Sequence, residues 1–144
     1  CAFLQYRTRN GVEGSLIADG SGLTISNVSD YRKKERITDL SGSLNTINSL
    51  RPREYYYKEG FGNPTRAFAG FIAHELEDTL LPQLTTGTKD QTVTEEDLDS
   101  GLLSGMEVGD PVYQSVSYTD NELITHLVKA VQELSAEVEK LKGN

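Results

Sequence analysis

The serine and the lysine at positions 29 and 34 are the residues of this chain whose types and spacing could do chemistry. A serine hydroxyl is a weak nucleophile until a neighbouring base removes its proton, and a lysine amine is that base in the serine–lysine variant of the serine-protease arrangement. An ordinary lysine has a pKa of about 10.4, so such a base must be buried or lie beside other cations. Both residue types are common on solvated surfaces, and a polar turn is therefore the alternative explanation of Ser29 and Lys34.

The separation of Ser29 and Lys34 does not suit a regular helix or strand. In an α-helix, five positions amount to about 500°, which would leave the two side chains roughly 140° apart. In a strand the side chains would point to opposite faces, with α-carbons about 17 Å apart. The segment must therefore turn between the two residues, or Lys34 must serve a neighbouring subunit. In either case the reaction would depend on correct folding.

The first 28 residues predict β structure. Asn10 and Gly11 give a strong hairpin signal, and a second turn is expected over residues 19–22. Two or three short strands with few apolar residues cannot form a core alone. We therefore interpret residues 1–28 as the C-terminal β end of a larger fibrous structure. A small sheet added to the downstream domain is the alternative.

The middle of the chain predicts the short elements of an α+β fold with small antiparallel β-elements. Apolar residues recur at helical spacing over about residues 39–50, and this helix would be capped by Thr38 or Asp39 and stopped by Pro52. The elements expected next are strands over 53–58 and 66–72, a short helix over 73–79, a polar excursion over 85–109 and a strand over 112–118.

A helix over about residues 119–142 is the clearest predicted element. Thr119 and Glu122 form a capping box in front of it. Apolar residues then alternate by three and four positions, as in the seam of a coiled coil: Ile124, Leu127, Val131, Leu134, Val138 and Leu141. An amphipathic helix packed on its own domain is the alternative, because the seam is short.

The charge of the chain is acidic and unevenly distributed. The net charge is -8, and the charges of residues 1–28 sum to zero, so residues 29–144 carry all of it. This balance argues against a nucleic acid or an anionic membrane as a partner. Hydrophobic residues make up 36%, which predicts a lean core that oligomerisation would help to stabilise. No metal-ligand spacing and no apolar run of about 20 residues is evident, and we expect no metal, cofactor or membrane span.

Four further motifs follow the Ser29 segment in order. They are Leu50–Lys58, Ala69–Leu76, Tyr118–Ile124 and Ala130–Leu134. Together with the Ser29 segment, this ordered set resembles the C-terminal, self-cleaving intramolecular chaperone domain of phage tailspikes and tail fibres, including the endosialidase tailspikes. The resemblance covers residues 29–144. It implies a homotrimer, because the parent fibres are three-fold, although the seam alone, with β-branched residues alternating with leucine, would favour a dimer.

The resemblance also implies a cleavage site. Such domains cut their own chain on the N-terminal side of the motif serine, which would make Val28–Ser29 the scissile bond. Ser29 would then be the nucleophile and Lys34 the base. Asp30 also matches the family pattern and is a possible supporting residue.

Two further side chains are rival bases. Lys33 stands where the family more often has an apolar residue, so it offers a second amine beside Lys34. His74 is the other candidate, and packing beside the strand end at Gly70–Ala73 would also explain it.

The resemblance therefore implies an intramolecular chaperone and single-turnover serine endopeptidase. It would drive trimerisation and folding of the upstream β-structured fibre or tailspike of the same polypeptide and then release itself. Assembly is expected in the host cytoplasm, with the parent fibre on the virion tail and residues 85–109 as a candidate arm that grips it. The alternative is a non-cleaving trimerisation module retained at the fibre tip. A carbohydrate-binding tip would need clustered exposed aromatic residues, and the chain has no tryptophan.

Overall fold

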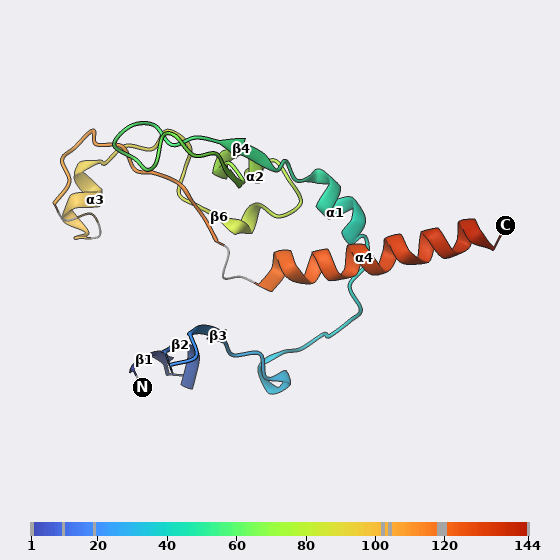
Figure 1. Ribbon diagram of the computed structural model, residues 1–144. Helices are drawn as coiled ribbons and strands as arrows, with labels where there is room; N and C mark the ends of the chain where they lie inside the picture. Colours follow the sequence, from blue (N-terminus) through green and yellow to red (C-terminus); the bar gives the residue numbers. More distant parts are fainter. Residues whose placement is uncertain are drawn as a thin grey trace. The chain divides into compact units, whose positions relative to one another are not determined.

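The computed structural model describes residues 2–9, 11–18, 20–101, 103, 105–117 and 121–143. The chain divides into two compact units, residues 1–39 and residues 40–144, each of which has its own architecture (Figure 1). The first unit contains a small antiparallel sheet, whereas the second combines short helices, short strands and a long C-terminal helix. The predicted α+β class is therefore confirmed.

Three antiparallel strands in the order β1-β2-β3 form the first unit, as the hairpin signals predicted. Their bounds are β1 (Ala2–Thr8), β2 (Gly11–Ala18) and β3 (Leu23–Asn27). The strands approach closely at Gly14, where a Cβ atom would come within 2.9 Å of the carbonyl oxygen of Ser26. Gly14 thus permits the pairing of β2 with the end of β3.

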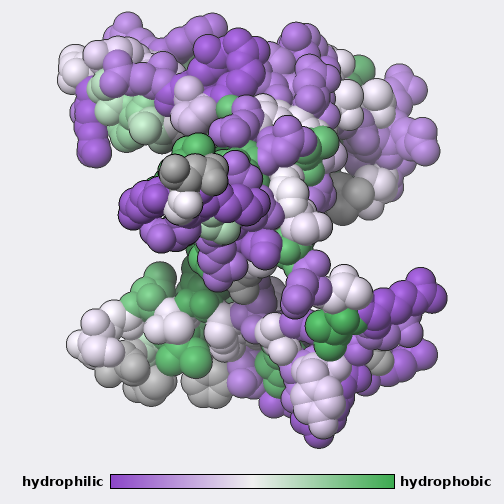
Figure 2. Space-filling model, turned by 90° about the vertical axis from the view of Figure 1, so that its right-hand side faces the viewer, coloured by the Kyte–Doolittle hydropathy of each residue, from purple (hydrophilic) through white to green (hydrophobic). Residues whose placement is uncertain are grey.

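One face of this sheet carries an uncovered apolar row. Leu4, Leu16 and Ile25 are successive cross-strand neighbours in the register of the three strands. Leu4 and Ile25 are 51% and 57% exposed. Apolar atoms of this unit are visible in the lower part of Figure 2. An exposed apolar row is a surface suited to packing against another segment, and the interpretation of residues 1–28 as the end of a larger β-structure stays a prediction.

The second unit has a small core of four buried leucines. Leu50, Leu76, Leu81 and Leu84 are at most 9% exposed, and partly buried apolar side chains surround them. These leucines lie on or beside three short helices: α1 (Ser43–Ser49), α2 (Ala73–Glu77) and the 3₁₀ helix η2 (Pro82–Leu84). The core is lean, as the composition predicted.

Two short antiparallel pairs complete the second unit. They are β4 (Arg53–Tyr55) with β5 (Phe68–Gly70), and β6 (Thr85–Thr86) with β7 (Ser115–Val116). Strands β4, β5 and β7 lie within the predicted strand segments but are shorter, whereas β6 lies at the start of the predicted polar excursion, where no strand was expected. The rings of Tyr55 and Tyr57 pack against Phe68, with centroids 6.1 and 5.2 Å away, so packing explains two of the three consecutive tyrosines.

Helix α1 begins later than the sequence predicted. Its N-cap is Gly42, in the left-handed region at φ 72°, and not Thr38 or Asp39. Gly42 offers no side chain to the free N–H groups of the first turn. The carboxylate of Glu133 accepts those of Ser43 and Leu44 instead, at 3.3 and 2.8 Å. A residue far along the chain therefore replaces the local cap that sequence reasoning assumed.

The polar excursion contains a helical turn, α3 (Glu95–Asp99). Thr94 and Asp97 form a capping box in front of it, in which the Thr94 N–H donates to the Asp97 carboxylate at 2.8 Å. Asp97 also accepts from the Thr94 hydroxyl, and these bonds hold the pKa of its carboxyl below the ordinary value. The acidic run thus starts a short helix, and its role as an arm stays a prediction.

Helix α4 (Asn121–Lys142) confirms the predicted C-terminal helix. Thr119, the predicted capping residue, lies outside the described residues. One face of α4 packs on α1 through His126, Ala130 and Glu133. The six seam residues lie on the adjacent face and are 40–76% exposed, so the described part of the chain leaves the seam uncovered. Helix α4 is thus an amphipathic helix packed on its own unit, and a coiled coil through the uncovered seam stays a prediction.

Candidate functional site

A tight turn follows the last strand of the first unit. The 3₁₀ helix η1 (Tyr31–Lys33) begins after Asp30, whose side chain accepts the backbone N–H of Arg32 at 2.9 Å. The same carboxylate accepts two further hydrogen bonds from the Arg32 guanidinium, at 2.9 and 2.8 Å. Asp30 therefore holds both the backbone of the turn and one of its cations.

The turn brings Ser29 and Lys34 together within one chain. The amine of Lys34 donates to the hydroxyl oxygen of Ser29 at 2.5 Å. The backbone N–H of Lys34 closes the turn by donating to the carbonyl oxygen of Tyr31 at 3.0 Å. Of the two geometric solutions that the spacing allowed, the turn is sufficient to bring the two groups together within one chain.

The preceding lysine has a different partner. The amine of Lys33 donates to the carboxylate of Glu13, on β2, at 2.6 Å. Glu13 also accepts the hydroxyl of Thr8 at 2.7 Å. The bonds from Lys33 and Thr8 hold the pKa of the Glu13 carboxyl below its ordinary value. The two neighbouring amines are thus separated, with Lys34 at the serine and Lys33 at the sheet.

Val28, the residue before Ser29, is also held by β2. The backbone N–H of Val28 donates to the carbonyl oxygen of Glu13 at 2.9 Å, which extends the pairing of β2 and β3 to the edge of the turn. A shallow, open hollow of about 430 Å³ lies here, lined by Val12, Val28, Asp30, Arg32 and Lys33. The bond between Val28 and Ser29 therefore joins the end of the sheet to the start of the turn.

The single chain leaves the site open to solvent. Ser29 and every residue from Tyr31 to Leu40 are exposed, and Asp30 is half-buried. Hence the described residues of the first unit do not by themselves provide the burial that a lysine base needs. The cations that the sequence places around Lys34 are partly neutralised, since Arg32 is paired with Asp30 and Lys33 with Glu13.

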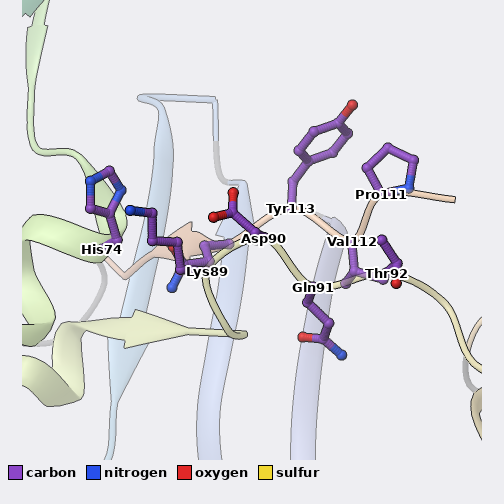
Figure 3. A pocket seen from close by; sticks show the side chains of 9 residues that line it. His74, Lys89, Asp90, Gln91, Thr92, Pro111, Val112 and Tyr113 are labelled. Carbon is purple, nitrogen blue, oxygen red and sulfur yellow. The ribbon is translucent and has the colours of Figure 1, made fainter. Parts of the chain in front are cut away.

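His74, the rival base, lies in α2 of the second unit. It lines a hollow of about 440 Å³ whose wall also includes Lys89, Asp90, Gln91, Pro111 and Tyr113. In Figure 3, His74 and Lys89 lie at one end of this hollow and Pro111 at the other. The hollow is built from the second unit alone.

The sequence analysis did not predict the ion pair that joins the motifs Leu50–Lys58 and Ala69–Leu76. Arg53 donates two hydrogen bonds to the carboxylate of Glu75, at 2.8 and 2.5 Å, and Arg51 adds a longer contact of 3.5 Å. Arg53, and then Arg51 and His74 more weakly, hold the pKa of the Glu75 carboxyl below its ordinary value. The second and third motifs of the chain are therefore joined by an ion pair. The only sequence signal was opposite charge in two separate motifs.

The motif Ala130–Leu134 has a similar role, because its Glu133 caps α1. Beside it, the hydroxyl of Ser43 lies 2.9 Å from Nδ1 of His126, and Ser43 is fully buried. These contacts anchor α4 to α1.

Among the described residues, no group of three or more histidine, cysteine, aspartate or glutamate side chains is arranged to hold a metal ion. Nor does any described helix combine the length and apolar character that crossing a membrane would take.

Comparison with protein families gives a match to part of the chain. Residues 29–86 match a peptidase family described as chaperone of endosialidase. The match starts at Ser29 and runs through η1, α1, the β4–β5 pair and α2 to the end of β6. No curated protein matches the chain. Residues 29–86 are therefore similar to an endosialidase-type intramolecular chaperone domain, and the similarity begins at Ser29.

Proposed function

We propose that this chain is a trimeric intramolecular chaperone that cuts its own Val28–Ser29 bond once the upstream β-structure has folded. The observation that carries the proposal is the 2.5 Å hydrogen bond from the Lys34 amine to the Ser29 hydroxyl. It is supported by the family match, whose first residue is that serine. Ser29 would be the nucleophile, and Lys34 would be the base.

The proposed reaction is a hydrolysis in two steps. The Ser29 oxygen attacks the carbonyl carbon of Val28 through a small ring, while its proton passes to the Lys34 amine. The C–N bond then breaks, the proton is returned to the freed Ser29 amino group, and an ester links Val28 to the Ser29 oxygen. Water hydrolyses this ester to leave a Val28 carboxylate and a free Ser29 hydroxyl. The net change is one peptide bond and one water molecule consumed.

Association of three chains would complete the site. A lysine is a base near neutral pH only when its surroundings disfavour its proton, and the single chain leaves Lys34 exposed. The uncovered seam of α4 supplies a surface for association. In this proposal, trimerisation brings the turn into a drier environment and cleavage follows. Assembly would take place in the host cytoplasm, with the parent fibre then borne on the virion tail.

The test compares the two lysines in the full-length chain. We expect Ser29→Ala and Lys34→Ala to leave an uncut precursor on a denaturing gel, whereas Lys33→Ala is still cut. Mass spectrometry of the unmutated chain after cleavage should show a fragment that begins at Ser29. Hydroxylamine added during the reaction should trap the ester as a Val28 hydroxamate. Normal cleavage of Lys34→Ala would remove the proposed base.

A retained trimerisation module is the second candidate. It is favoured by the solvent exposure of Ser29 and by the uncovered seam of α4, which needs no cleavage to act. If the purified trimer stays intact through Val28–Ser29 under all conditions, this function replaces the first.

A further inference from the structure

We infer that Glu13 is a positioning residue for the cut, and that through it the reaction senses the register of the upstream sheet. This inference rests on the proposed function. Glu13 belongs to β2, so it would remain with the parent fibre and not with the released chaperone. The upstream structure would thus supply part of the machinery that severs it.

Glu13 contacts the chain on both sides of the Val28–Ser29 bond. Before the bond, its carbonyl oxygen accepts the N–H of Val28 at 2.9 Å. After the bond, its carboxylate accepts the amine of Lys33 at 2.6 Å. Thr8 of β1 donates to the other carboxylate oxygen at 2.7 Å, which fixes the direction of the side chain. The contact with Thr8 depends on the pairing of β1 with β2, and the contacts with Val28 and Lys33 depend on the pairing of β2 with β3.

The contact with Lys33 decides which amine meets Ser29. Lys33 and Lys34 are neighbours with side chains of equal reach, and either could approach the hydroxyl. With Lys33 held by Glu13, the amine of Lys34 occupies the position at Ser29. Without Glu13, the turn loses its tether to β2, and the Lys33 amine can compete for the hydroxyl.

The same contact makes the cut sensitive to strand register. Glu13 is the extra residue where the register of β1 and β2 shifts, and its carboxylate reaches Lys33 from that position. A slip of one residue in the pairing of β2 with β3 would move Lys33 along the strand and away from this carboxylate. A misregistered sheet would therefore leave Lys33 free. The cut would be fast only after the end of the fibre has paired correctly.

The test is a charge swap in the full-length chain. Glu13→Ala should slow cleavage at low salt, and the double variant Glu13→Lys with Lys33→Glu should restore the parental rate. Because the pair is partly exposed, the loss should be at most about fivefold. Salt screens the ion pair between Glu13 and Lys33, so rising salt should lower the cleavage rate of the unmutated chain towards that of Glu13→Ala. The cleavage rate of Glu13→Ala itself should hardly change with salt.

Glu35→Ala is the matched control, because it removes an equal charge from an exposed carboxylate near the turn. It should be cut at the parental rate. Parental cleavage of Glu13→Ala, or failure of the charge swap to restore a slowed rate, would overturn the inference while Ser29→Ala still blocks the cut. If Ser29→Ala is cut normally, the proposed function fails instead.

Discussion

The carboxylate of Glu133 caps helix α1 by accepting the backbone N–H of Leu44 at 2.8 Å, although Leu44 lies 89 positions earlier in the chain. The N-cap residue itself, Gly42, makes no side-chain cap. A carboxylate at a helix N-terminus satisfies free N–H groups and interacts favourably with the helix dipole. The start of α1 and the middle of α4 therefore stabilise each other.

Removal of this cap should lower stability in a pH-dependent way. The backbone N–H groups, that of Leu44 first, hold the pKa of Glu133 below its ordinary value of 4.5. A carboxyl whose pKa is lower in the folded state stabilises the fold above its unfolded pKa, and this contribution is lost as the pH falls through and below 4.5. Glu133→Ala should lower Tm by a few degrees at pH 7 and by less at acidic pH. Glu137→Ala, on an exposed position one turn later, is the control.

Replacing either partner of the ion pair between Arg53 and Glu75 should lower the stability of the second unit. Arginine makes two parallel bonds to the carboxylate, and lysine cannot reproduce that geometry. We expect Arg53→Lys to lower Tm, measured by circular dichroism. Arg51→Lys is the matched control, since Arg51 makes one contact of 3.5 Å and its side chain is 61% exposed. Equal losses in the two variants would show that the bidentate geometry is unimportant.

The contrast between α4 and α1 shows what local patterns could predict. The heptad repeat of α4 and the Asn10-Gly11 hairpin signal are local patterns, and helix α4 and the pairing of β1 with β2 are present in the structure, although Asn10 itself lies outside the described residues. The start of α1 depends on Glu133, which no pattern near residue 42 could reveal. Elements whose ends are satisfied from a distance are the ones that sequence reasoning misplaces.

In the candidate site, too, the local contact was predictable from the sequence and the distant contacts were not. The residue types at positions 29 and 34 gave a testable geometric condition, and the turn capped by Asp30 meets it. The partner of Lys33 was not predictable, because Glu13 reaches it only through the register of the sheet. The pairing of Arg53 with Glu75 likewise needed the fold of the second unit.

The leucine core offers a direct test of the fold of the second unit. Leu76 is 1% exposed, and Leu76→Ala should cost about 2–5 kcal/mol of unfolding free energy, because it removes buried surface and leaves a cavity. Leu80, four positions on, is 53% exposed, so Leu80→Ala should change stability by less than about 0.5 kcal/mol. Urea unfolding of both variants measures the difference. Similar losses would contradict the packing described here.

The seam of α4 should control association. A charged residue at a buried position of a coiled coil is strongly unfavourable, and a trimer buries it three times. We expect Val131→Asp to convert a trimer to a monomer in sedimentation experiments. Gln132→Asp, on the neighbouring exposed position outside the seam, should remain trimeric. A parental chain that sediments as a dimer or a monomer would refute the trimer directly.

Asp30 should act through the turn and not through proton transfer. Its carboxyl has a pKa held below the ordinary value of 3.8 by the Arg32 side chain and, second, by the Arg32 backbone N–H. It therefore stays ionised above about pH 5, and its contribution to the turn is lost only as the pH falls through and below 3.8. Asp30→Asn keeps an acceptor for the backbone N–H, whereas Asp30→Ala removes it. Cleavage should accordingly be slowed more by alanine than by asparagine. The pH–rate profile of Asp30→Asn should keep the parental shape above about pH 5, and a displaced profile there would instead make Asp30 a proton carrier.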